Sequence, residues 1–246
     1  MPNLDLVIVC LAAFFAGNLN ALAGGGSFIT LPSLIFVGIP PVLANTTSAA
    51  ALLPGYLGSV LGFRNLYKEL DIKYLSTLIL ITSSAAILGA FLLINTKDEV
   101  FLSIVPWLIL LATLLFILKP NLISKNKSTY TYQYIGTAIV SVYGGYFNGG
   151  LGIALLAVLS FGKNLSIKNL SAIKSLLSFL LTTVSVTVFF FNGFIDLSYV
   201  FFMMVFAAIG GFFGAKLTQA LPEKTVRRFV IFIGLLMSFL LFLLWV

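Results

Sequence analysis

The sequence predicts an all-α polytopic integral membrane protein built from two inverted-topology repeats. Two features of composition indicate the membrane class: 60% of the 246 residues are hydrophobic, and only 9% are charged. A soluble domain carries about 25% charged residues, so these few charges cannot cover a globule of this size. Most of the surface must therefore contact lipid. A third observation, an internal duplication, predicts the repeats.

Each half of the chain contains five hydrophobic runs. The first, third, fourth and fifth runs of the first half approach the length of about 20 residues with which a helix crosses the hydrocarbon. The second run of each half is shorter, about 18 Å long as a helix, and cannot cross alone. The runs are 4–23, 27–37, 46–63, 72–94 and 100–118, then 134–147, 151–161, 172–191, 197–217 and 226–246. We therefore expect short or broken helices near the midplane.

The two halves match each other at several positions. At one constant offset Gly17 matches Gly145, Asn20 matches Asn148 and Gly24 matches Gly152, and at a slightly smaller offset Gly89-Ala90 matches Gly214-Ala215. Identities in the same order beside five similar runs indicate a tandem duplication. We expect a first membrane repeat over 1–118, a polar cytoplasmic linker over 119–132 and a second membrane repeat over 133–246. Together they form one transmembrane domain.

The basic residues predict the orientation. Between its third and fourth runs the first half carries Arg64, Lys68 and Lys73, whereas the second half carries only Asp196 there. In the next loop the bias is reversed. Because Lys and Arg accumulate in cytoplasmic loops, equivalent loops face opposite sides, most basic loops are cytoplasmic, and both termini are external. Each half then crosses an odd number of times, either five times or three times beside a re-entrant hairpin. Inverted repeats are typical of secondary transporters.

The composition excludes several kinds of chemistry. The chain has no histidine and one cysteine, Cys10, so a histidine base, a histidine metal site and an intrachain disulfide are ruled out. All seven carboxylates lie in loops or near predicted membrane boundaries, which leaves no buried acid for a proton relay. The basic residues that give the net charge of +7 lie mainly in loops, where they set the orientation of the protein in the membrane. We expect no nucleic-acid partner, no metal, no cofactor and no catalytic residue.

Glycine-rich breaks at matching places predict a substrate site. They are 23–27 and 148–152, each beside a short run. Free amides at a helix N-terminus bind anions, and glycine lets the backbone approach a ligand. Close helix packing is the alternative role for such glycines.

Polar residues around the third runs complete the predicted site. Residues 45–48 look like a helix N-cap, which alone explains one or two of them. Lys174 matches Thr46 and lies inside a hydrophobic run, where it either snorkels to the surface or supplies the cation for a bound anion. The predicted substrate-binding residues are Asn20, Gly24, Gly25, Gly26, Ser27, Asn45, Thr46, Thr47, Asn148, Gly149, Gly150, Gly152 and Lys174.

In their order and spacing these motifs resemble the TauE/SafE (sulfite exporter) family. The residues that carry the resemblance are Gly24-Gly25-Gly26-Ser27, Leu31-Pro32, Gly38 and 44–48 in the first half, and 143–152 with Ala172-Ile173-Lys174 in the second. The resemblance covers essentially the whole chain. It implies a plasma-membrane transporter that exports sulfur-containing anions such as sulfite or sulfoacetate. Thr46 and Asn148 stand where this family often has glycine.

The sequence thus predicts a secondary transporter or facilitator, not an enzyme, that moves a small anion outward. The expected anion is a sulfur oxyanion or an organosulfonate, and the expected partners are this anion and the lipid bilayer. A passive anion channel is the alternative, because both use a polar path between helices. An intramembrane enzyme with Ser27 as nucleophile and Lys174 as base is a further alternative. The sequence leaves open which anion is carried, the coupling ion and whether the chain forms a homo-oligomer.

Overall fold

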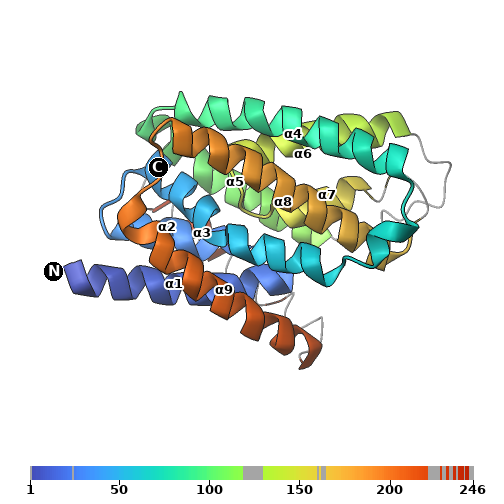
Figure 1. Ribbon diagram of the computed structural model, residues 1–246. Coiled ribbons are helices and arrows are strands. Elements are labelled where there is room, and N and C mark those ends of the chain that lie inside the picture. The colour runs from blue at the N-terminus through green and yellow to red at the C-terminus, as the bar shows by residue number, and fades with distance from the viewer. Residues whose placement is uncertain are drawn as a thin grey trace.

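Every regular element of the described chain is a helix (Figure 1). The computed structural model describes residues 2–23, 25–118, 130–159, 161 and 165–220, and positions 228, 231–232, 235–236, 238–240 and 242–243 near the C-terminus. The helices are α1 (Pro2–Ala23), α2 (Ser27–Phe36), α3 (Pro41–Gly62), the 3-10 helix η1 (Leu66–Glu69), α4 (Ile72–Ile94), α5 (Asp98–Leu118), α6 (Tyr130–Tyr146), α7 (Leu151–Leu159), α8 (Ile167–Phe191) and α9 (Leu197–Ala220). The predicted all-α class is confirmed. Most of the predicted linker, 119–132, and much of the last hydrophobic run lie outside the described residues.

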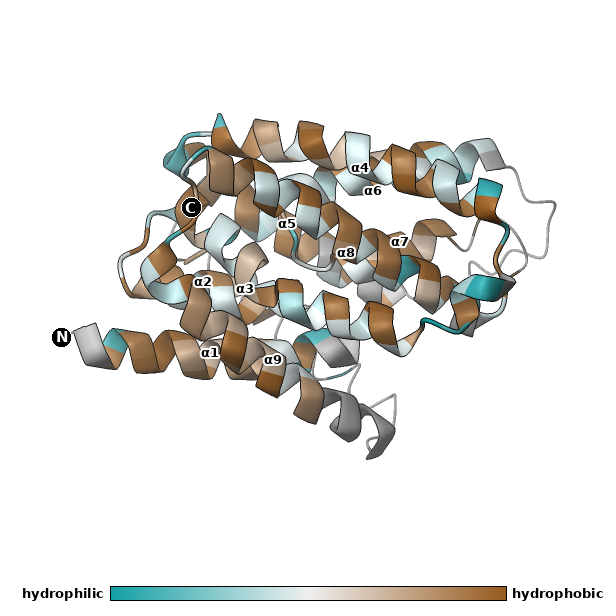
Figure 2. Ribbon diagram, in the orientation of Figure 1, coloured by the Kyte–Doolittle hydropathy of each residue, from teal (hydrophilic) through white to brown (hydrophobic). Residues whose placement is uncertain are grey.

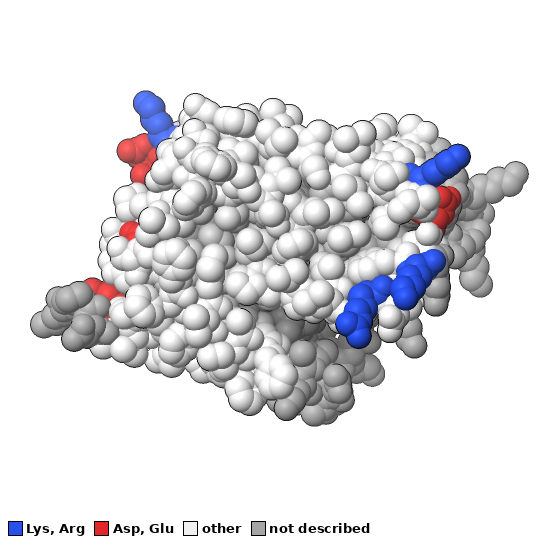
Figure 3. Space-filling view, in the orientation of Figure 1, with Lys and Arg blue, Asp and Glu red and all other residues white. Residues whose placement is uncertain are grey.

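The outside of the bundle is hydrophobic along its length and charged at its ends. Hydrophobic residues follow the helices from end to end in Figure 2, and the charged side chains in Figure 3 gather at two opposite ends of the visible face. Large side chains such as Phe91 of α4 and Phe201 of α9 are exposed. By length and composition, α4 and the part of α8 over Asn169–Phe191 can cross a bilayer. Because such a surface is stable only against lipid, the protein is an integral membrane protein.

Backbone contacts at glycine join the two halves of the chain. Helix α1 packs against α9, and α4 packs against α6. A Cβ atom added to Gly210 would overlap the carbonyl oxygen of Phe14, and one added to Gly89 would overlap the carbonyl oxygen of Val142. Val142 follows Phe14 by the same offset that relates the matching glycines of the two breaks, so residues at matching places of α1 and α6 each contact a glycine of the other half. Because only glycine allows this approach, these positions fix how the halves pack.

The short helices form hairpins with the helices that precede them. The side-chain amide of Gln133, near the start of α6, donates to the Tyr74 hydroxyl of α4 and to the Leu159 carbonyl at the end of α7. Helices α6 and α7 therefore enter and return at the same end of the bundle. Since α7 has 9 residues, it is about 13.5 Å long, and its junction with α6 lies inside the bundle. Helix α2 likewise returns beside α1 (Figure 1). The pairs α1–α2 and α6–α7 are thus helical hairpins, as the re-entrant topology requires, and the number of membrane crossings stays a prediction.

Matching helices of the two halves run in opposite directions. The backbone amide of Asp196, just before α9, donates to the Thr47 hydroxyl near the start of α3, so both helices begin at one end. At the other end, the Tyr67 hydroxyl, after α3, donates to the Ala172 carbonyl near the start of α8. Helix α3 therefore runs opposite to α8, and α4 runs opposite to α9 (Figure 1). An inverted duplication would give these directions, and the repeat itself stays a prediction.

Replacing Gly210 with alanine is expected to destabilise the protein, because the added methyl group would overlap the backbone of Phe14. Forcing an atom into a closely packed contact costs about 1–3 kcal/mol, which should lower the thermal unfolding midpoint of the detergent-solubilised protein. Gly58→Ala is the matched control, since a Cβ there meets nothing within 4 Å and alanine favours the helix. Equal midpoints for the two variants would contradict the close α1–α9 contact.

Candidate functional site

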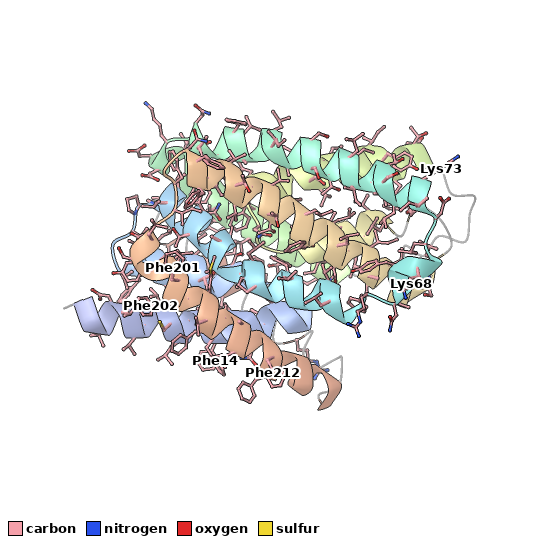
Figure 4. All side chains as sticks on the ribbon, viewed as in Figure 1. Phe14, Lys68, Lys73, Phe201, Phe202 and Phe212 are labelled. Carbon is pink, nitrogen blue, oxygen red and sulfur yellow. The ribbon has the colours of Figure 1, made fainter. Side chains whose placement is uncertain are left out.

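A cavity of about 630 Å³ is lined by α1, α3, the start of α7, α8 and α9. Three of the residues predicted from the sequence, Asn20, Gly152 and Lys174, lie in its wall. They come from both halves of the chain, so the fold brings them together over long sequence separations. The lining follows α3 from Leu52 to Phe63. The cavity therefore extends toward the end of the bundle that bears the basic loop after α3, where Figure 4 labels Lys68 and Lys73.

Lys174 gives the cavity its charge. Within the described part of the chain it is the only charged residue in the cavity wall, and no carboxylate lines the wall with it. Its side chain is partly buried. An ammonium group inside the membrane is costly unless a partner of opposite charge or a polar group compensates it. The cavity wall therefore provides an uncompensated positive charge, to which an anion would bind favourably.

Two neutral polar groups accompany this lysine. Asn20 Oδ1 and Ser178 Oγ are buried and have no hydrogen-bond partner among the described residues, and both residues line the cavity. Buried polar groups nearly always have partners, so an unpartnered group that also lines a cavity is a candidate contact for a ligand or water. Other unpartnered groups, such as Ser185 Oγ, do not line this cavity. A hydroxyl can donate its proton, and the Asn20 amide can present its NH₂ group after a half-turn of its terminal bond. Both side chains can therefore donate to an oxyanion.

Asn148 joins the α6–α7 junction to two other helices and does not line the cavity. The Tyr56 hydroxyl of α3 donates to Asn148 Oδ1, and Asn148 Nδ2 donates to the Thr182 hydroxyl of α8, both at 3.2 Å. Tyr56 itself lines the cavity. The structure thus gives Asn148 a different position from its counterpart Asn20, although the sequence treated the two alike.

Gly25 and Gly149, one from each break, pack closely around one aromatic ring. A Cβ on Gly149 would lie 2.8 Å from the ring of Phe28, and one on Gly25 would lie 3.3 Å from the same ring. Gly26 packs against the backbone of α1. Gly150 has a φ of +73°, a region that favours glycine. Close packing and a turn therefore explain these four glycines. Close packing was the alternative role that the sequence allowed. Gly24 lies outside the described residues.

The polar cluster at the start of α3 connects helices instead of lining the cavity. The side-chain amide of Asn45 donates to the Tyr146 carbonyl at the end of α6, and the Thr47 hydroxyl accepts the amide before α9. The Thr46 hydroxyl donates to carbonyls one turn earlier in its own helix. Ser27 is also buried, and none of these described residues is in the cavity wall.

The expected capping role of residues 45–48 is wrong. Helix α3 begins at Pro41, with Pro40 at its N-cap position, so the polar residues lie inside the helix. Proline is favourable at the first helical position because its fixed φ suits a helix and because an N–H at that position would have no acceptor within the helix. The Pro40-Pro41 pair therefore starts the helix one turn earlier than the hydrophobic run suggested.

Sequence reasoning missed four polar residues of the cavity wall: Tyr56 and Ser59 of α3, and two serines of α8, Ser175 and Ser178. The two serines belong to a stripe on α8, in which Ser175, Ser178, Thr182 and Ser185 are all buried. Their spacing of three or four residues places them on one face of the helix. This periodicity of hydroxyls, next to Lys174, is a signal that could have found them.

Comparisons with known proteins identify the family. The family described as sulfite exporter TauE/SafE matches residues 9–241. A probable membrane transporter protein of Haemophilus influenzae is 26% identical over 239 residues, which cover 95% of this chain and 92% of the relative. The probable membrane transporter protein YfcA of Escherichia coli K12 is 26% identical over 245 residues, with 95% and 88% covered. No solved structure matches the chain.

The family match spans nearly the whole chain and includes every cavity-lining residue described above. The relatives that align over its full length are named as membrane transporters. The protein therefore belongs to the sulfite exporter TauE/SafE family and is a membrane transporter, not an enzyme.

Proposed function

We propose that the protein is a secondary transporter or facilitator that moves a small anion, a sulfur oxyanion or an organosulfonate, out of the cell across the plasma membrane. The observation that carries this proposal is the cavity wall, where Lys174 faces no described carboxylate and two buried donors, Asn20 and Ser178, accompany it. Charge-assisted hydrogen bonds to an oxyanion are among the strongest that proteins make. The name of the family supports the sulfur class.

The charge of the loops supports an outward direction of transport. The cavity extends toward the end that bears Arg64, Lys68 and Lys73. Basic loops face the cytoplasm, so this end is inside and the anion would enter the cavity from the cytoplasm. Both chain termini would then lie outside. The inside-negative potential drives an anion outward with about 2.3 kcal/mol per charge per 100 mV, so export needs no coupling ion.

The packing of α3 favours a transporter over a passive channel. Residues 44–52 of this helix are all buried, and the cavity lining begins only at Leu52. The cavity therefore ends midway along α3 and is accessible from one side. A channel needs a continuous polar path across the membrane. A transporter that opens its site to one side at a time instead needs the path to the other side to be closed, as it is here along residues 44–52.

Purified protein in liposomes should move one sulfur anion selectively and saturably from a panel of sulfite, sulfate, thiosulfate, sulfoacetate, taurine, acetate and chloride. An imposed potential should drive the flux, and unlabelled anion on the opposite side should accelerate tracer exchange. Ohmic single-channel currents would favour the channel instead. Absence of flux for every anion under both polarities would contradict an anion site.

Lys174→Ala should lower anion transport at least about tenfold, because a hydrogen bond to a charged group contributes about 1.5–3 kcal/mol. Initial rates in proteoliposomes, normalised to reconstituted protein, measure the effect. Lys174→Arg should retain part of the activity, since it keeps the charge. Lys73→Ala is the control, because Lys73 is exposed at the end of the bundle. Wild-type rates in Lys174→Ala would assign this lysine to the membrane surface.

Single cysteines should report the orientation. The only native cysteine, Cys10, is buried, so its own labelling by maleimide should be weak. Lys97→Cys, in the loop between α4 and α5, should react with a membrane-impermeant maleimide on intact cells. Lys68→Cys, in η1, should react only after permeabilisation, because it lies at the other end of α4. The opposite labelling pattern would reverse the proposed direction of transport.

A further inference from the structure

We propose that Tyr56 is a positioning residue for anion binding, because its hydroxyl determines which end of the Asn20 amide faces the cavity. The proposal rests on the proposed function, since it assigns a role at the same cavity. Two observations carry it: the hydrogen bonds that surround Tyr56 and the unpartnered oxygen of Asn20 in the cavity wall.

Tyr56 joins the two matching asparagines of the chain. It forms a side-chain hydrogen bond with Asn20 of α1 and with Asn148 at the junction of α6 and α7. Asn148 in turn donates to the Thr182 hydroxyl of α8. These side chains therefore form one chain of hydrogen bonds that crosses both halves of the protein, with Asn20 at its cavity end.

The bonds of this chain share one direction. Tyr56 has a single hydroxyl proton, which it donates to Asn148 Oδ1, so toward Asn20 its oxygen can only accept. Asn20 then uses its NH₂ group for Tyr56, and Asn20 Oδ1 is left without a described partner. Since a hydroxyl has one proton and an amide has one donor end and one acceptor end, each bond determines the direction of the next.

An anion requires the opposite direction. The lone pairs of an amide oxygen repel a negative charge, whereas an NH₂ group donates to it. When the Asn20 amide makes a half-turn, its oxygen faces Tyr56, and Tyr56 has to donate to it. Asn148 then turns as well, so that its NH₂ group donates to Tyr56 and its oxygen accepts the proton of Thr182. Every bond of the chain is kept, and the Asn20 NH₂ group faces the cavity.

Burial makes the direction of these bonds important. Tyr56, Asn148 and Thr182 are only 7%, 4% and 1% exposed, so bulk water does not replace a missing partner, and an unpaired buried group is costly. Thr182 follows Ser178 by one turn on the same face of α8. The chain thus links Asn20 to the helix that carries Ser178 and Lys174, the other proposed contacts of the anion.

The test is equilibrium binding of labelled sulfite to the detergent-solubilised protein, with sulfite flux in proteoliposomes measured in parallel. Tyr56→Phe removes only the hydroxyl and should raise the Kd for sulfite about three- to tenfold, the contribution of one neutral hydrogen bond. Tyr67→Phe is the matched control. Its hydroxyl donates to the Ala172 carbonyl at the end of the bundle, outside the cavity, so its loss should leave the Kd unchanged.

A double-mutant cycle distinguishes positioning from a structural role. If Tyr56 acts through Asn20, Tyr56→Phe should have no effect on the Kd in an Asn20→Ala background, whereas a structural loss would add to that of Asn20→Ala. Thr182→Val should also raise the Kd, and only when Asn20 is present, while Thr182→Ser should keep the wild-type value. This second pair of variants keeps the test usable if Tyr56→Phe does not fold.

The outcomes separate this role from the transport function. An unchanged Kd in Tyr56→Phe, or equal effects with and without Asn20, would overturn the role of Tyr56 and, with wild-type binding and flux intact, leave the transport function standing. Absence of binding and flux in the wild type for every anion of the panel above would instead overturn the proposed function itself.

Discussion

The structure depends on one requirement of the bilayer: each backbone polar group inside it needs a partner from the protein. The α6–α7 hairpin meets this requirement at its junction with side chains. The Tyr143 hydroxyl donates to the Gly149 carbonyl, and the Asn45 amide donates to the Tyr146 carbonyl. These bonds let α6 stop inside the bundle. Because α6 and α7 stop there, Gly152 reaches the cavity wall, so the position of the cavity follows from where the helices end.

The sequence predicted the features that depend on composition and on local pattern. Hydrophobic content predicted the membrane class, and Lys174 was recognisable as a candidate site residue because it lies inside a hydrophobic run. The contacts of Thr47 and Asn45 could not be predicted, because their partners are 149 and 101 residues away and no local pattern records such distances. Ser178 was missed for a different reason: a serine in a hydrophobic helix usually bonds its own backbone, and only its place in the cavity wall, together with its unpartnered hydroxyl, distinguishes it.

Asn20 and Asn148 occupy matching positions in the sequence but have different surroundings in the structure. They lie at matching places of the two halves, and Tyr56 forms a side-chain hydrogen bond with each. Only Asn20 lines the cavity, however, while Asn148 also donates to Thr182. A cavity with access from one side requires such a difference, since one half must be closed where the other is open. The asymmetry therefore arises from the conformation of the chain and from its substituted neighbours: Tyr56 has a valine, Val184, at the matching place.

The glycine contacts between α1 and α9 and between α4 and α6 have a mechanical consequence. Each joins a helix of one half to a helix of the other through backbone atoms, at Gly210 with Phe14 and at Gly89 with Val142. Each pair has a second close approach about one turn away, of Gly17 to Ala207 between α1 and α9 and of Gly145 to Ala86 between α4 and α6, so neither pair can rotate freely about a single point. The two helix pairs therefore act as rigid joints between the halves, and a change in access to the cavity would have to come from helices outside these joints.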